Sequence, residues 1–228
     1  MIYGNTRKAR FIDRPNRFVA NVEVNGTITT AHVKNTGRCK EILQPGIEVI
    51  LEKVHNPLRK TQYSLISAYK GDILINIDSQ VPNQVVAEAL KGSILNVFGP
   101  VTALKREVTF GNSRFDIYYE SNNIRGFIEV KGVTLETGGF AMFPDAPTER
   151  GVRHIYEMAE AVKKGYKGCI LFLIQLGGVR YFTPNKLMDP EFAEALDHAH
   201  RDGVDIIAYD SIVNENSIEL GSSVQVLL

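Results

Sequence analysis

The chain has 228 residues, of which 44% are hydrophobic and 23% are charged, with a formal net charge of zero at pH 7. This composition is typical of a folded protein with one large or two small domains, and it excludes extensive disorder. No apolar run reaches the about 20 residues that cross a bilayer, and the first residues lack the apolar stretch of a signal peptide. Cys39 and Cys169 follow no metal-binding spacing and make no disulfide framework. We therefore expect a cytoplasmic protein without a membrane span.

Charge is distributed unevenly along the chain. Residues 1–80 contain 12 Lys and Arg against 7 Asp and Glu, whereas the remaining residues contain 14 against 19. A basic surface attracts polyanions, and an acidic cluster can hold metal ions. Ordinary solvated charge is the other interpretation, and the balance alone does not decide between them.

The first 80 residues have the pattern of short strands with little helix. Apolar residues alternate over 18–24, and Asn25-Gly26 then supplies a two-residue hairpin turn. Further strands are expected over 28–33, 47–54, 63–69 and 73–77. This arrangement indicates a small barrel or sandwich, and one option is an OB-type β-barrel, a fold that often binds oligonucleotides. We predict a first domain over residues 1–80.

The remainder of the chain alternates helices with strands. Helices are expected over 81–90, 148–164 and 190–201, each ended by a nearby glycine. Strands are expected over 102–110, 113–120, 125–135, 169–176, 179–182 and 204–209. Continuous apolar strands between helices indicate a mixed-sheet α/β domain, parallel in its later part. We predict that this second domain covers residues 81–228.

The strand around Glu129 and Lys131 carries the strongest chemical signal. Side chains alternate along a strand, so Glu129 and Lys131 share one face while Val130 points into a core. Asp116 lies on the preceding strand, and a short turn between the strands predicts antiparallel pairing. Asp116 and Glu129 can then lie on the same face of adjacent strands.

Two carboxylates and the Val130 carbonyl are hard oxygen ligands that suit Mg²⁺ or Mn²⁺. A metal held there polarises a phosphoryl group and acidifies a bound water, and Lys131 beside it can offset developing negative charge. Asp, a gap of 12 residues and then Glu-x-Lys is the arrangement of PD-(D/E)XK nucleases. The other interpretation is a cross-strand ion pair.

The helix that follows adds two candidate residues. Arg150, His154 and Glu157 share one face, and Thr148 is a plausible N-cap after a proline-rich loop. Arg150 and His154 lie near the helix start, where anions such as phosphate are favoured. The alternative is a solvated helix face.

A loop in the first domain concentrates hydrogen-bond donors. His32, Lys34, Asn35, Thr36 and Arg38 lie within seven residues, and Gly37 permits close backbone approach. These residues are candidates for gripping phosphates. Arg14 and Arg17 add positive charge near Phe11 and Phe18, which we expect to be core residues. The alternative is a polar loop that caps a short helix over 40–43.

These motifs together resemble the sugar fermentation stimulation protein A family over nearly the whole chain. The marks of the resemblance are His32-Val33-Lys34-Asn35-Thr36-Gly37-Arg38, Ser113-Arg114-Phe115-Asp116, Glu129-Val130-Lys131-Gly132-Val133-Thr134-Leu135 and Phe143-Pro144-Asp145-Ala146-Pro147-Thr148-Glu149-Arg150-Gly151. Lys34 departs from the family pattern, where proline is expected. The resemblance implies an OB-like first domain, a restriction-endonuclease-type second domain and non-specific DNA binding. It also implies that Asp116 and Glu129 are metal ligands and that Lys131 is the catalytic lysine.

We expect a non-specific DNA-binding protein with a Mg²⁺-dependent phosphodiester-hydrolysing site, as a monomer or a homodimer. One alternative is a DNA-binding regulator on a nuclease-derived scaffold without turnover. Another is a small-ligand sensor for sugars, suggested by the family name alone, and the sequence contains no Trp for a sugar-stacking platform. The carboxylates favour retained chemistry, because without a metal they would repel phosphate.

Overall fold

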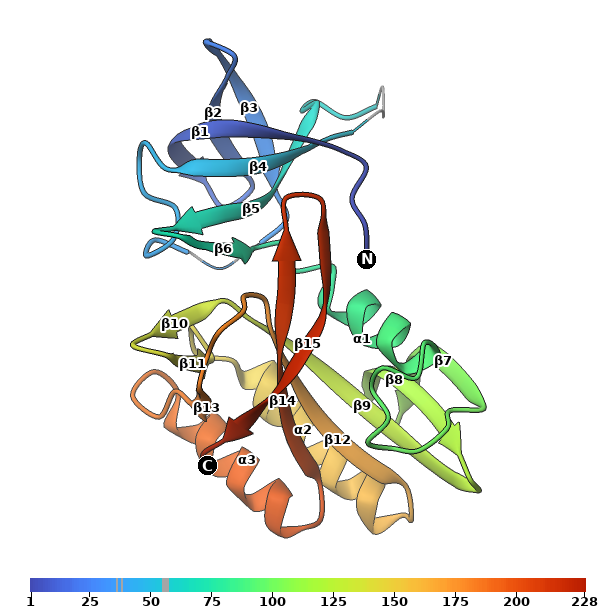
Figure 1. Ribbon diagram of the computed structural model, residues 1–228. Coiled ribbons are helices and arrows are strands. Elements are labelled where there is room, and N and C mark those ends of the chain that lie inside the picture. The colour runs from blue at the N-terminus through green and yellow to red at the C-terminus, as the bar shows by residue number, and fades with distance from the viewer. Residues whose placement is uncertain (36, 38, 55–57) are drawn as a thin grey trace.

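The chain folds into two domains, each built around its own β-sheet (Figure 1). The computed structural model describes residues 1–35, 37, 39–54 and 58–228. The first domain is an OB-like barrel, and the second is a mixed sheet with three helices. This confirms the expected fold class.

The barrel consists of six strands in the order β3-β2-β1-β4-β5-β6. They are β1 (Asn5–Asn16), β2 (Val19–Val24), β3 (Thr27–Val33), β4 (Glu48–Lys53), β5 (Tyr63–Lys70) and β6 (Ile73–Asn76). A parallel pairing of β3 with β5 joins strands that are distant in this order and closes the barrel. The predicted hairpin turn is confirmed, because Asn25 and Gly26 both have positive φ, as such a turn requires.

Three expectations in this domain were wrong. Strand β1 was not predicted, because only Ala9 and Phe11 are buried in it while basic residues face solvent. Phe18 is 50% exposed rather than a core residue, since it lies in the turn before β2. Residues 40–42 form a turn rather than a helix, with two main-chain N–H groups sharing the carbonyl of Cys39.

The second domain contains a nine-stranded sheet in the order β10-β11-β13-β15-β14-β12-β9-β8-β7. Its strands are β7 (Ala103–Phe110), β8 (Ser113–Ser121), β9 (Ile124–Val133), β10 (Leu135–Thr137), β11 (Phe140–Phe143), β12 (Lys167–Ile174), β13 (Tyr181–Pro184), β14 (Asp205–Asn214) and β15 (Ser217–Val226). The central strands β9, β12 and β14 run parallel, which confirms the expectation for the later part of the sheet. Strands β10, β11 and β15 were not predicted.

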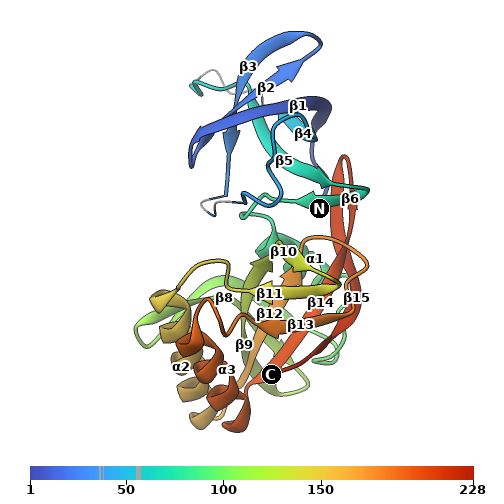
Figure 2. The ribbon, with the colours of Figure 1, turned by 90° about the vertical axis from the view of Figure 1, so that its left-hand side faces the viewer.

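Three helices cover the two faces of this sheet. They are α1 (Pro82–Lys91), α2 (Glu149–Lys163) and α3 (Pro190–Arg201). Helix α1 packs on one face against Ile128 and Val130, while α2 and α3 lie side by side on the other (Figure 2). The predicted N-cap is confirmed, because Thr148 Oγ1 accepts a hydrogen bond from the main-chain N–H of Gly151. Among the described residues, no helix is long and apolar enough to cross a membrane.

The β14–β15 hairpin extends from the second domain to the barrel (Figure 1). At its tip, Glu215 forms an ion pair with Lys8 of β1, and the main-chain carbonyl of Asn216 accepts a hydrogen bond from Tyr3. A second ion pair joins Lys70 of β5 to Glu136 of β10 at 3.0 Å. These contacts fix the barrel relative to the sheet that carries the candidate carboxylates.

Candidate active site and nucleic-acid interface

Strands β8 and β9 place Asp116 and Glu129 beside each other. The strands are antiparallel with Ile117 opposite Ile128, and the same register continued by one residue puts Asp116 opposite Glu129. The Asp116 carboxylate accepts hydrogen bonds from the main-chain N–H of Val130 at 2.8 Å and from Asn83 of α1 at 2.6 Å. The antiparallel pairing predicted from the short turn is confirmed.

Glu129 is buried and has two partners on one of its oxygens. Its Oε1 accepts hydrogen bonds from Lys131 Nζ at 2.7 Å and from His154 Nδ1 at 2.6 Å. Arg150 Nε lies 3.4 Å from the other ring nitrogen of His154 and donates to it. Glu129 Oε2 is buried and has no hydrogen-bond partner among the described residues. The cluster therefore holds the carboxylate in place while one oxygen stays available.

The environment separates the acidities of the two carboxyl groups. Burial raises the pKa of Asp116 to about 6, and the negative charge of Glu129 adds to this shift. Burial also acts to raise the pKa of Glu129, but the His154 hydrogen bond and the Lys131 ammonium outweigh it and hold that pKa below its usual range. Near neutral pH both groups are therefore carboxylates, with Asp116 the weaker acid.

The residues present fit a hard divalent cation that keeps several waters. Within the described ranges, no three His, Cys, Asp or Glu side chains lie close enough to hold a metal ion together. A metal here would take Asp116, Glu129 and the Val130 carbonyl, with water completing its coordination. The buried and unpartnered Oε2 of Glu129 supports this, because such an atom is costly to leave without a partner.

The barrel loop predicted to grip phosphates is anchored at its start. Lys34 Nζ forms a 2.8 Å ion pair with Asp78, whose side chain is fully buried, and Ser79 Oγ donates to the Lys34 carbonyl. His32 is half-buried in β3, where it pairs with Val19. Thr36 and Arg38 lie outside the described residues. Lys34 therefore has its charge neutralised in the fold, which sequence reasoning missed.

Arg14 holds the middle of this loop. Its guanidinium donates to the main-chain carbonyls of Gly37 at 2.7 Å, Asn35 at 2.6 Å and Arg17 at 2.7 Å. Arg17 is exposed, with its guanidinium 5.7 Å from the centre of the exposed Phe18 ring. Of these two predicted DNA-binding residues, Arg14 shapes the loop and Arg17 faces solvent.

Two motifs singled out in the sequence meet at the domain junction. A Cβ atom added to Gly37 would lie 2.7 Å from Asp145 Oδ2, so the barrel loop closely approaches the loop that leads into α2. A cavity of about 160 Å³, here called the junction cavity, opens between the domains. Its lining includes Asn35, Gly37, Gly132, Asp145 and Gln175. Gly132 directly follows Lys131, so the cavity lies at the end of the strand that carries the candidate site.

Gln175 is a site residue that sequence reasoning missed. Its side-chain amide donates to Asn76 Oδ1 at 2.9 Å and to the Asp78 carbonyl at 3.1 Å, and thereby joins the sheet to the end of the barrel. It is 2% exposed and follows the apolar strand β12. A polar residue at the carboxyl end of a buried parallel strand was the available signal.

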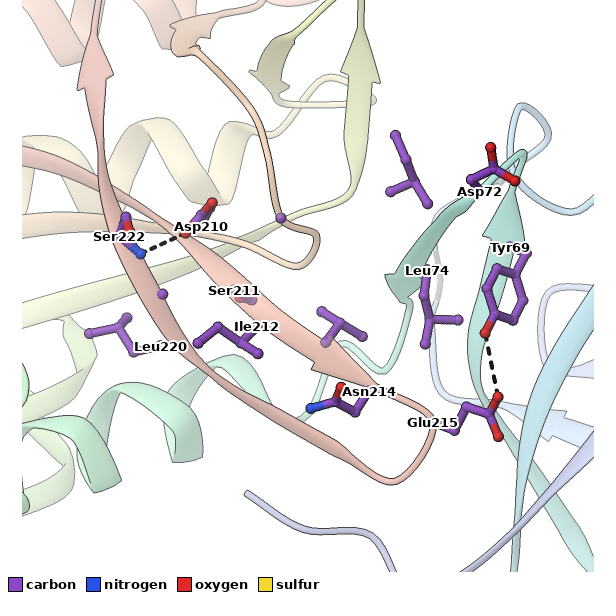
Figure 3. A pocket seen from close by; sticks show the side chains of 14 residues that line it. Tyr69, Asp72, Leu74, Asp210, Ser211, Ile212, Asn214, Glu215, Leu220 and Ser222 are labelled. Carbon is purple, nitrogen blue, oxygen red and sulfur yellow. Dashed lines mark hydrogen bonds between the residues drawn. The ribbon is translucent and has the colours of Figure 1, made fainter.

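A larger cavity lies elsewhere. It measures about 850 Å³ and lies between the β5–β6 turn and the β14–β15 hairpin (Figure 3). Asp210, which lines it, accepts main-chain hydrogen bonds from Gly178 and Ser222. Its lining contains none of the predicted site residues. Size alone therefore does not identify the functional site.

Comparisons with known proteins agree with both domains. A family described as "SfsA N-terminal OB domain" matches residues 12–77, and one described as "Sugar fermentation stimulation protein RE domain" matches residues 80–217. The sugar fermentation stimulation protein homolog of Alkaliphilus oremlandii is 52% identical over 99% of this chain and 98% of the relative. That of Clostridium botulinum (strain Langeland) is 55% identical over 97% of each. The structure of Pyrococcus furiosus SfsA in complex with Ca²⁺ is 30% identical, with a TM-score of 0.91 over 100% of this chain and 98% of that one.

Proposed function

The chain belongs to the sugar fermentation stimulation protein family, and we propose that it binds DNA and hydrolyses phosphodiester bonds with a divalent metal ion. The observation that carries this proposal is the Glu129 carboxylate, which is held by Lys131 and His154 while its second oxygen is buried without a partner. A purely structural ion pair gives no reason for that buried and unpartnered oxygen.

The metal ligands in this proposal are Asp116, Glu129 and the Val130 carbonyl. A bound Mg²⁺ or Mn²⁺ supplies Lewis acidity toward a phosphoryl oxygen and a water of lowered pKa. The relative from Pyrococcus furiosus is described as a complex with Ca²⁺, which shares with Mg²⁺ the preference for oxygen ligands. This likeness supports a divalent-metal site in the present chain.

The remaining site residues have distinct roles. Lys131 keeps an ammonium beside the carboxylates, where it offsets negative charge that develops on a phosphate. His154 donates to Glu129 and is a positioning residue for that carboxylate. Arg150 is exposed at the start of α2, next to His154, where its charge can attract a phosphate of the bound strand.

DNA binding in this proposal uses the barrel as well as the sheet. The barrel half of the chain carries the basic excess, and its 34–37 loop approaches the loop that leads into α2. A polyanion that reaches the junction therefore meets basic residues on the barrel and the metal ligands on the sheet. Asn35 and Gly37 line the junction cavity, and Arg17 lies on the exposed turn nearby.

Cleavage of labelled DNA with Mg²⁺ or Mn²⁺ tests the proposal. Single-stranded, duplex and branched substrates are incubated with wild type, Lys131→Ala, Glu129→Gln and the exposed control Lys105→Ala. The wild type and Lys105→Ala are expected to cut at least one substrate, and both site variants are expected to lose at least 100-fold in rate, as oxyanion-stabilising groups do. DNA affinity is expected to survive in Lys131→Ala.

Three outcomes separate the interpretations. Loss of cleavage in Lys131→Ala with retained DNA affinity supports a hydrolytic site. Absence of cleavage by wild type on every substrate leaves a DNA-binding protein without turnover. Equal cleavage by wild type and both site variants would assign the activity to other residues.

A further inference from the structure

The barrel carries a second cavity close to the junction. This cavity, here called the barrel cavity, measures about 430 Å³ and lies between the end of β1, the β1–β2 turn and the loop after β3. We propose that it holds one base of a single-stranded nucleic acid, whose backbone then passes Gly37 toward the candidate active site. This inference rests on the proposed function and names its substrate class.

The inner part of the barrel cavity is apolar. Phe11 is 2% exposed and Leu43 is 7% exposed, and both line the cavity together with Pro45. A flat hydrophobic ring is the chemistry that such a surface accepts, and an aromatic side chain adds the possibility of stacking. A nucleobase has this form, whereas a phosphate or a sugar alone does not.

The rim of the barrel cavity is mostly cationic. Arg17 and Lys40 are both exposed, and both line it. Arg14 adds a third positive charge, with its guanidinium directed to the carbonyls of the 34–37 loop. The single acidic residue in the lining, Asp13, accepts a hydrogen bond from Asn21 at 2.7 Å. An apolar interior with a cationic rim matches a base joined to phosphates.

Gly37 connects the barrel cavity with the junction cavity, because it lines both. Past Gly37, the junction cavity is bounded by Gly132 and Gln175 at the end of β9 and β12. Glu129 and Lys131 precede Gly132 on the same strand. A strand anchored in the barrel cavity therefore has a continuous path along the loop toward the candidate metal ligands.

The path favours a single strand over a duplex. Bases in a duplex are paired and stacked, so one of them enters a cavity only after it is unpaired and extruded at a cost of a few kcal/mol. The junction cavity is only about 160 Å³, and Gly37 leaves little space beside Asp145. A single strand has free base faces and a narrow backbone, so it meets both requirements without that cost.

Binding without metal tests the inference independently of cleavage. A fluorescein-labelled oligodeoxythymidine, the same strand with abasic sites, and its duplex with oligodeoxyadenosine are titrated in EDTA, with anisotropy as the readout. We expect the intact strand to bind about tenfold more tightly than the abasic strand, since base–aromatic stacking contributes at this level. The duplex is expected to bind more weakly than the intact strand.

Charge reversal then locates the site. The double variant Arg17→Glu, Lys40→Glu is expected to lose the preference for the intact over the abasic strand and at least about tenfold in affinity. The matched control Lys60→Glu changes an exposed lysine that does not line the cavity, so its preference should equal that of the wild type. Thermal unfolding verifies that each variant is folded.

The outcomes for this inference differ from those for the proposed function. Equal affinity for intact and abasic strands, or tighter binding of the duplex, overturns it even if the protein cleaves DNA. Base-dependent binding that the double variant removes supports it even if no cleavage occurs. Base-dependent binding that persists in the double variant places the base elsewhere and overturns the assignment to the barrel cavity.

Discussion

His154 Nδ1 lies 2.6 Å from Glu129 Oε1, so the first turns of α2 hold a carboxylate in the middle of β9. Because a carboxylate only accepts hydrogen bonds, the ring donates from Nδ1, and its other nitrogen accepts from Arg150. Lys131 shares the same carboxylate oxygen. Helix α2 therefore orients one face of the candidate metal site, and Glu129 Oε2 is left for a ligand.

Replacement of His154 by alanine should weaken metal binding. The change removes the donor that orients Glu129, and loss of such a partner typically lowers metal affinity 10–100-fold, an order-of-magnitude expectation. Removal of this buried hydrogen bond should also lower the free energy of unfolding by about 1–3 kcal/mol. Calorimetric titration with Mg²⁺ and urea unfolding measure the two effects. His198→Ala is the matched control, because His198 is exposed on α3; equal metal affinity in both variants would contradict the positioning role.

The sequence was sufficient for the parts of this site that depend on local pattern. Alternation over 125–135 placed Glu129 and Lys131 on one face, and the short turn after β8 made the antiparallel partner predictable. Thr148 marked the start of α2 because its side chain can cap the helix. These features need only neighbouring residues, so one strand or one turn carries enough information.

The missing parts depend on contacts between distant segments. Nothing near Lys34 in the sequence indicates that Asp78 neutralises it, because the two meet only when the barrel closes. The β14–β15 hairpin was missed for the same reason, since its outer half packs against the barrel rather than within its own sheet. Gln175 lies at the end of an apolar run, and its partners come from β6 and the segment that follows it.

Lys34→Ala should chiefly destabilise the protein rather than flatten the salt dependence of DNA binding. The Asp78 side chain is fully buried, so removal of its partner leaves an uncompensated charge and costs about 3–5 kcal/mol. The double variant Lys34→Met, Asp78→Asn removes both charges and should recover most of that loss. Urea unfolding measures the stabilities, and binding at several salt concentrations measures the slope. A steep drop in the slope of a fully folded Lys34→Ala protein would instead assign Lys34 to phosphate contact.

Metal binding should depend on pH through Asp116. Its pKa is raised from 3.8 to about 6, chiefly by burial, so below pH 6 a proton competes with the cation. Magnesium affinity should fall up to about tenfold for each pH unit below 6 and level off above it. For stability the sign is opposite, because the folded state holds this proton more tightly: Asp116 favours folding most below pH 4, and that contribution of about 3 kcal/mol is lost as the pH rises to 6. Titrations between pH 5 and 8 test this, and Asp116→Asn should bind more weakly with a flatter profile.

Gln175→Leu should loosen the junction between the domains. The substitution keeps the size of the side chain but removes the donor to the Asp78 carbonyl and to Asn76 Oδ1, both of which are buried. Because Asn76 Oδ1 also accepts from the main-chain N–H of Asp78, the expected loss is near that of one buried acceptor, about 1–3 kcal/mol. Calorimetry should show a lower and broader unfolding transition, since the barrel and the sheet lose a shared contact. Gln84→Leu is the matched control, as Gln84 donates to Glu88 on the exposed side of α1. A transition as sharp and as high for Gln175→Leu as for Gln84→Leu would show that Gln175 does not couple the domains.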